Sequence, residues 1–230
     1  MGSPISPPPI REYLPEYLPA YLSNGLLGLR VGPIPLRDGI CIVGGLVGRD
    51  PVAKVEAFAR APYPLAGDIS VNGMPLHSLS NLARFEEQRY DFSCGELTTR
   101  FRYRVGEVEA LVEVLTFCSR TQPTLVLQEV KLTVDAECSL EIAALVDPGD
   151  VAGRYLTRST MTPGSEEAVV DGHLSWEPHG GLTRCGIAYI TRFDGGEGVE
   201  RWVDDQDELG PLRTAYRLHG RPGRTYVLRQ

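Results

Sequence analysis

The feature that most constrains the fold is a run of alternating apolar and polar residues from Glu96 to Leu145. Side chains two residues apart share one face of a β-strand, so the apolar half of this run can face a core and the polar half water. Gly106-Glu107 lies between two such stretches and predicts a tight turn. The polar half carries mostly Arg before this turn and Glu after it, and opposite charges stabilise a hairpin. The run therefore predicts consecutive antiparallel strands.

Short strand-like segments recur along the rest of the chain. Asn72-Gly73 is a strong hairpin signal, because both residues tolerate the positive φ of a type I′ turn. We expect further strands at 39–43, 69–71, 85–92, 124–134, 139–146, 167–170, 173–176, 185–192, 214–218 and 225–228. About a dozen strands with regular turns predict an all-β fold. The expected architecture is a large two-sheet antiparallel sandwich with at most one or two short helices.

Three segments depart from the strand pattern. Residues 1–20 are rich in proline, which blocks helix and ladder pairing, so we expect an extended lead-in arm before a single domain at 21–230. Asp50-Pro51 suits the start of a helix and predicts a short one. Residues 194–211 are acidic and rich in glycine, which predicts a long surface loop.

Composition narrows the class of protein. With 230 residues, of which 42% are hydrophobic and 23% charged, the chain can bury a sizeable core without metal or disulfides. A net charge of −7 disfavours nucleic acid and anionic membranes as partners. No run approaches the roughly 20 apolar residues of a membrane span and no leader pattern opens the chain, so we expect a cytoplasmic protein. The five widely spaced cysteines are predicted to be reduced core residues.

The local signatures of a self-sufficient enzyme are missing from the sequence. There is no G-x-S-x-G nucleophile elbow, no phosphate-binding loop, and no H-E-x-x-H or C-x-x-C arrangement. The acidic pairs are adjacent in sequence, and adjacent residues on a strand point to opposite faces, so they do not predict a glycosidase dyad. We therefore expect no catalytic residue, no metal and no cofactor in this chain.

Residues 21–30, YLSNGLLGLR, resemble the N-G-x-x-G-x-R signature that opens the N-terminal domain of glycoside hydrolase family 65. The family includes trehalose, maltose and kojibiose phosphorylases, acid trehalases and related glucosidases. Segments 40–46, 61–65, 69–73, 90–99 and 115–119 follow in the family's order, and the resemblance covers residues 13–230. The chain departs from the pattern at Thr116, where the family's R-F-x-S strand has Arg, and at Asp91-Phe92, where L-D-M is usual.

The resemblance implies a β-super-sandwich of the galactose-mutarotase type. In the family this domain precedes a helical linker and an (α/α)6 barrel, which carries the catalytic acid. The barrel is missing from these 230 residues. The resemblance therefore implies a non-catalytic accessory domain, cut from a longer hydrolase or phosphorylase of carbohydrate metabolism. Its partner would be the barrel. The domain would pack against the barrel, contribute to the rim of its sugar pocket, or support a homodimer of the enzyme. The sugar, and the choice between hydrolysis and phosphorolysis, stay open.

Six residues are candidates for carbohydrate binding or domain contact, namely Tyr21, Asn24, Gly25, Gly28, Trp176 and Trp202. The two glycines suit a loop with unusual backbone angles, and the asparagine amide can bind sugar hydroxyls or cap the backbone. The tryptophans can stack on sugar rings or pack in a core.

Two other functions are consistent with the sequence. A free-standing module that binds a glucose-containing oligosaccharide requires an exposed aromatic platform beside a groove. A mutarotase-like sugar epimerase is the less favoured alternative, and it requires two converging histidines and a carboxylate. The local candidates for that arrangement are His173, His179 and Glu177.

Overall fold

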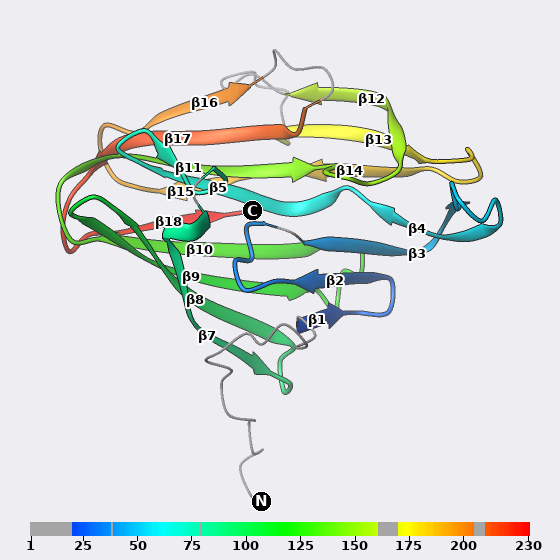
Figure 1. Ribbon diagram of the computed structural model, residues 1–230, viewed down its shortest axis with the longest axis horizontal. Helices are drawn as coiled ribbons and strands as arrows, with labels where there is room; N and C mark the ends of the chain where they lie inside the picture. Colours follow the sequence, from blue (N-terminus) through cyan, green and yellow to red (C-terminus); the bar gives the residue numbers. More distant parts are fainter. Residues whose placement is uncertain (1–19, 38, 79, 161–169, 205–209) are drawn as a thin grey trace, which may run out of the picture.

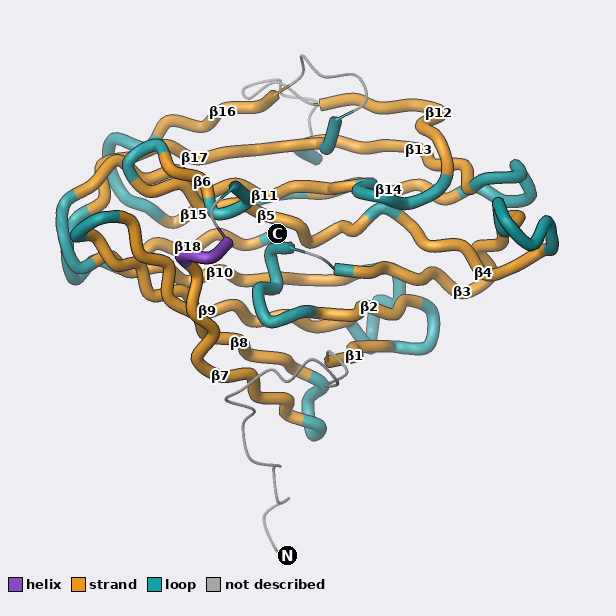
Figure 2. The backbone as a smooth tube through the Cα atoms, in the orientation of Figure 1, coloured by secondary structure: helices purple, strands orange, loops and turns teal. Residues whose placement is uncertain are grey.

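The computed structural model describes residues 20–37, 39–78, 80–160, 170–204 and 210–230. Within these ranges the chain forms eighteen β-strands and one short 3-10 helix, η1 (Ser80–Leu82), the purple turn of Figure 2. The predicted all-β class is confirmed. The expected arm at 1–20 and strand at 167–170 lie outside the described residues, apart from one terminal residue of each.

The strands group into four antiparallel sheets, whereas two were expected (Figure 1). The six-stranded sheet has the order β15 (Arg192–Asp194), β18 (Thr225–Arg229), β10 (Val126–Val134), β9 (Val108–Cys118), β8 (Glu96–Val105) and β7 (Ala83–Asp91). The five-stranded sheet has the order β16 (Glu200–Asp204), β17 (Leu212–Gly220), β11 (Cys138–Asp147), β5 (Tyr63–Val71) and β6 (Met74–Pro75).

Two smaller sheets flank these. The four-stranded sheet comprises β1 (Ala20–Ser23), β2 (Leu27–Val31), β3 (Ile40–Arg49) and β4 (Glu56–Ala61), and the three-stranded sheet β12 (Gly153–Thr160), β13 (Gly172–Pro178) and β14 (Cys185–Tyr189). The C-terminal strand β18 is internal to the six-stranded sheet, between β10 and β15. Beyond it, the Gln230 side chain donates to the carbonyls of Pro64 at 2.6 Å and Leu145 at 3.2 Å, which belong to the five-stranded sheet.

The alternating run forms β8 to β11, as predicted. Alternate residues of β9 are buried along its whole length, and the turn at Gly106 pairs Val105 with Val108. The predicted charge pairing across the hairpin is also present, because Arg100 Nε donates to Glu113 Oε2 at 2.8 Å. Asn72-Gly73 likewise forms the predicted hairpin between β5 and β6, with both residues at positive φ.

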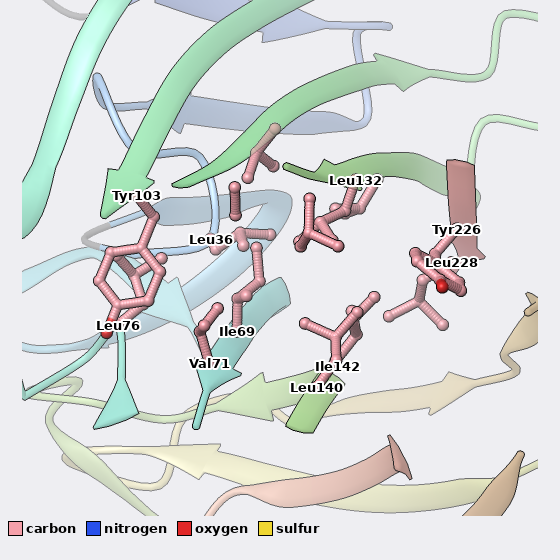
Figure 3. Packing of buried hydrophobic residues seen from close by; sticks show 14 of the residues in the cluster. Leu36, Ile69, Val71, Leu76, Tyr103, Leu132, Leu140, Ile142, Tyr226 and Leu228 are labelled. Carbon is pink, nitrogen blue, oxygen red and sulfur yellow. The ribbon is translucent and has the colours of Figure 1, made fainter. Parts of the chain in front are cut away.

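The main hydrophobic core lies between the six-stranded and five-stranded sheets. Figure 3 shows the two inner faces, with Tyr103 and Leu132 from one sheet and Ile69 and Ile142 from the other. The hydroxyl of Tyr103 donates to the Met74 carbonyl at 2.8 Å, so this large side chain is buried with its polar end satisfied. Packing between the sheets therefore fixes which face of each strand remains outside.

The cysteines are free thiols, and four of the five are at least half-buried, as predicted. Burial raises the pKa of Cys41 to about 12, with nearby Cys185 and Cys118 adding to the shift, and burial raises the pKa of Cys118 to about 11. The exception to the prediction is Cys94, which is exposed on the turn between β7 and β8.

The predicted helix at Asp50 is wrong. One carboxylate oxygen of Asp50 accepts hydrogen bonds from the N–H groups of Val52 at 2.8 Å and Ala53 at 2.6 Å, as an N-cap would. Lys54 then adopts a φ of 60°, which ends the turn, and the chain enters β4.

No helix in the described part of the chain is long and apolar enough to cross a membrane.

The predicted loop at 194–211 is also wrong in part, because strand β16 forms within it. Trp202 pairs with Ala215 of β17, so this segment extends the five-stranded sheet by one edge strand.

Candidate functional site

A broad groove of about 1040 Å³ lies over the outer face of the five-stranded sheet. Its floor comes from the strand positions that alternate with the core residues, so that Ile142 of β11 packs inward while Glu141 lines the groove. The turn after β11, the loop between β2 and β3, and the end of β4 form the walls. The topology therefore gathers polar side chains from distant parts of the chain on one surface.

One end of the groove holds a network around Glu141. Register places Arg217 directly opposite Glu141, and its Nε donates to Glu141 Oε2 at 2.5 Å. Arg213 donates to the other carboxylate oxygen. The guanidinium carbons of Arg213 and Arg217 lie 4.9 Å and 4.7 Å from the ring centre of Trp202, within cation–π range. Trp202, both arginines and the carboxylate thus hold one another in place.

Asp68 and His77 lie beside this network, because Glu141 pairs with Ser70 of β5, two residues from Asp68 on the same face. One oxygen of Asp68 lies 2.6 Å from His77 Nδ1, and the other accepts the backbone N–H groups of His77 at 3.1 Å and Ile69 at 3.0 Å. The Asp68 side chain is only 12% exposed, whereas His77 is open to solvent. The carboxylate is therefore fixed before any ligand arrives.

Formal charges on the groove lining balance. Among the described residues it carries four arginines and four carboxylates, namely Arg37, Arg60, Arg213, Arg217, Asp68, Glu141, Asp147 and Asp150. In the same part of the chain no three His, Cys, Asp or Glu side chains are grouped to hold a metal ion. The groove thus offers hydrogen-bond donors and acceptors without a net field of either sign.

Opposing effects act on the pKa of Glu141. Partial burial raises it, but hydrogen bonds and charge from Arg217 and Arg213 outweigh burial and hold the pKa below its ordinary value of 4.5. A carboxyl with a lowered folded-state pKa contributes stability that is fully present above its unfolded pKa and is lost as the pH falls through the folded one.

We expect Glu141→Gln to flatten the acid limb of the stability profile. The wild type should lose the contribution of this carboxylate below about pH 4.5, and the variant, which has no such group, should lose less. Urea unfolding at pH 7 and pH 3 measures the difference. Glu107→Gln, on an exposed turn, is the control and should keep the wild-type profile. Parallel profiles for wild type and Glu141→Gln would contradict the assignment.

The structure separates the two candidate tryptophans. Trp202 lines the groove, but Trp176 is only 3% exposed and packs edge-on against Tyr155, with ring centres 5.3 Å apart. Trp176 belongs to a small core between the three-stranded sheet and β17, where it meets Leu212. It therefore cannot offer a surface platform to a sugar.

The other four candidates lie together on the hairpin of β1 and β2, in a different sheet from the groove. Asn24 Oδ1 accepts from the N–H of Leu27 at 2.9 Å, and Asn24 Nδ2 donates to the carbonyls of Ser119 at 2.7 Å and Pro123 at 3.0 Å. Next to it, Gly25 has a φ of 94°. The Asn24 amide thus caps its own turn and ties it to the loop after β9.

Tyr21 and Gly28 form a contact on the same hairpin. A Cβ on Gly28 would lie 3.6 Å from the Tyr21 ring, which covers it, and Tyr21 is half-exposed. These two residues therefore present an aromatic surface on the four-stranded sheet, outside the groove lining.

The residues considered for an epimerase site do not converge. His173 lies near the start of β13 and His179 just beyond its end, roughly 20 Å apart at about 3.3 Å per strand residue. Glu177 is bound by Arg154 at 2.7 Å and by Arg184 at 3.1 Å. These three residues therefore do not form the arrangement that an epimerase requires.

Comparisons with known proteins give information about the fold alone. No family model matches the sequence, and no curated protein matches it. A solved structure of a candidate kojibiose phosphorylase from the human microbiome is similar, with a TM-score of 0.67 and 12% sequence identity over 91% of this chain. The match covers 29% of that protein, so this chain spans less than a third of its length. The described fold is thus similar to that of one part of this larger protein.

Proposed function

We propose that this chain is a non-catalytic N-terminal domain of a family 65 α-glucoside phosphorylase or hydrolase, with a β-super-sandwich of the galactose-mutarotase type. The observation that carries the proposal is the structural match, in which 91% of this chain corresponds to 29% of a candidate kojibiose phosphorylase. The family signature at 21–30 supports the same assignment independently of the fold. The role is to dock against an (α/α)6 barrel.

An apolar tip between β3 and β4 supports docking. Val52 is 89% exposed and Phe58 79% exposed, and Val55 is exposed beside them. Figure 2 shows this tip as loop at the end of the molecule where β3 and β4 meet. Exposed apolar side chains gathered in one place mark contact surfaces, because water solvates them poorly. The barrel of the parent enzyme is the proposed occupant, since the matched protein has more than two thirds of its length outside the match.

Two measurements test the proposal. The isolated chain should neither phosphorolyse nor hydrolyse kojibiose, maltose or trehalose, in assays with and without inorganic phosphate. The gene read beyond the codon for Gln230 should encode an (α/α)6 barrel in the same frame. Turnover of any of the three sugars by the purified chain would overturn the non-catalytic role, and a gene with no barrel would overturn the family 65 architecture.

A further inference from the structure

The balanced lining of the groove selects the charge of its ligand. An anion would meet as many carboxylates, which repel it, as arginines, which attract it, and the same balance holds for a cation. Desolvating charged groups is costly unless the ligand pairs with them, so a charged ligand gains little here. A neutral ligand with many hydroxyls can donate to the carboxylates and accept from the guanidinium groups, and such charge-assisted hydrogen bonds are strong.

The polar groups of the groove are fixed in advance. Glu141 is held by two arginines, and Asp68 by backbone N–H groups and His77. Ordering a long polar side chain on binding costs conformational entropy, so groups that are already ordered bind a ligand more tightly. Arg213 and Arg217 are ordered by the same contacts, which include Trp202.

The dimensions favour an extended ligand. Trp202 is on one edge strand of the five-stranded sheet and His77 follows the opposite edge strand, β6, so the groove crosses the whole sheet. Four strand spacings of about 4.8 Å make this distance roughly 19 Å. The volume of about 1040 Å³ is at the upper end of the range for small-molecule sites. An oligosaccharide fits these dimensions better than one sugar ring.

We propose that this groove binds a neutral oligosaccharide across the five-stranded sheet, with Glu141, Arg213 and Arg217 on β11 and β17 and, beside them, Asp68 and His77 of the β5–β6 hairpin. The choice of α-glucosides as ligands rests on the proposed function, whereas the existence of the site does not.

Isothermal calorimetry of the chain tests the site directly. The probes are maltotriose, maltose, kojibiose, trehalose and glucose at millimolar concentrations, with inorganic phosphate as a charged probe. We expect saturable binding that is tighter for maltotriose than for glucose, and none for phosphate. A preference for phosphate would overturn the neutral ligand, and silence for every sugar would overturn the site. Neither result tests the assignment to family 65, which depends on the gene sequence beyond the codon for Gln230 and on the activity assays.

Matched variants locate the binding. Glu141→Gln and Asp68→Asn should each weaken maltotriose binding at least tenfold. Glu129→Gln is the control, because Glu129 also pairs with two cations, Lys131 and Arg229, but lies on the six-stranded sheet. It should bind like the wild type.

Circular dichroism and thermal unfolding establish that each variant is folded. Trp202→Phe gives a second readout, since it should abolish the change in tryptophan fluorescence caused by maltotriose while Trp176 stays buried. Wild-type affinity in both Glu141→Gln and Asp68→Asn would place the sugar elsewhere and overturn the proposal.

Discussion

Phe101→Ala should lower the free energy of unfolding by about 3–5 kcal/mol, the cost of removing a buried aromatic side chain and leaving a cavity. Phe101 is 0% exposed in the middle of β8, opposite Val112 of β9, in the core between the two large sheets. Both sheets are internally hydrogen-bonded and cannot collapse far into the space. Urea unfolding should show a lower midpoint with an unchanged slope.

Phe58→Ala is the matched control, because it makes the same chemical change at a side chain that is 79% exposed. Its effect should stay within about 0.5 kcal/mol, as for most surface substitutions. Equal effects at the two positions would show that the faces of β8 are not oriented as described.

Gly153→Ala should lower the free energy of unfolding by about 1–3 kcal/mol, which is the usual cost of overpacking. A Cβ on Gly153 would lie 2.6 Å from the carbonyl oxygen of Glu177 and 2.6 Å from the indole of Trp176. The carbonyl belongs to the paired strand, and the indole is buried against Tyr155, so neither can move aside cheaply. Thermal unfolding should show a lower midpoint.

Gly186→Ala, in the same three-stranded sheet, tests whether space is the cause. A Cβ there would approach nothing closer than 3.9 Å. Alanine restricts the unfolded chain more than glycine does, so this variant should be neutral or slightly stabilising. A loss as large as that of Gly153→Ala would point to glycine flexibility instead of packing.

The sequence predicts the part of the fold that local pattern determines. The strands from β8 to β11 follow directly from alternation, because each buries one face and the turns between them are short. The error at Asp50 has a physical origin. A carboxylate that accepts from the next two N–H groups starts either a helix or a turn, and only later pairing of β4 with β3 decides between them.

The groove could be predicted only in part. Trp202 stands out by type, but its partners Arg213 and Glu141 are ordinary polar positions on apolar strands. Arg213 and Glu141 are 72 residues apart, and the register that joins them depends on which strands become neighbours. Asp68 and His77 meet for the same reason, through the β5–β6 hairpin. Alternation indicates which face a residue occupies but not what lies across from it.

The place of β18 has a consequence for the order in which the protein is assembled on the ribosome. Glu129 of β10 and Arg229 of β18 form an ion pair across 100 residues of chain, so β18 is translated well after the strand with which it pairs. Until then β10 presents an unpaired edge, which other chains can join. Only when Gln230 emerges can its side chain reach Pro64 and Leu145 and join the two large sheets. Nascent chains of this protein therefore need protection until β18 has been translated.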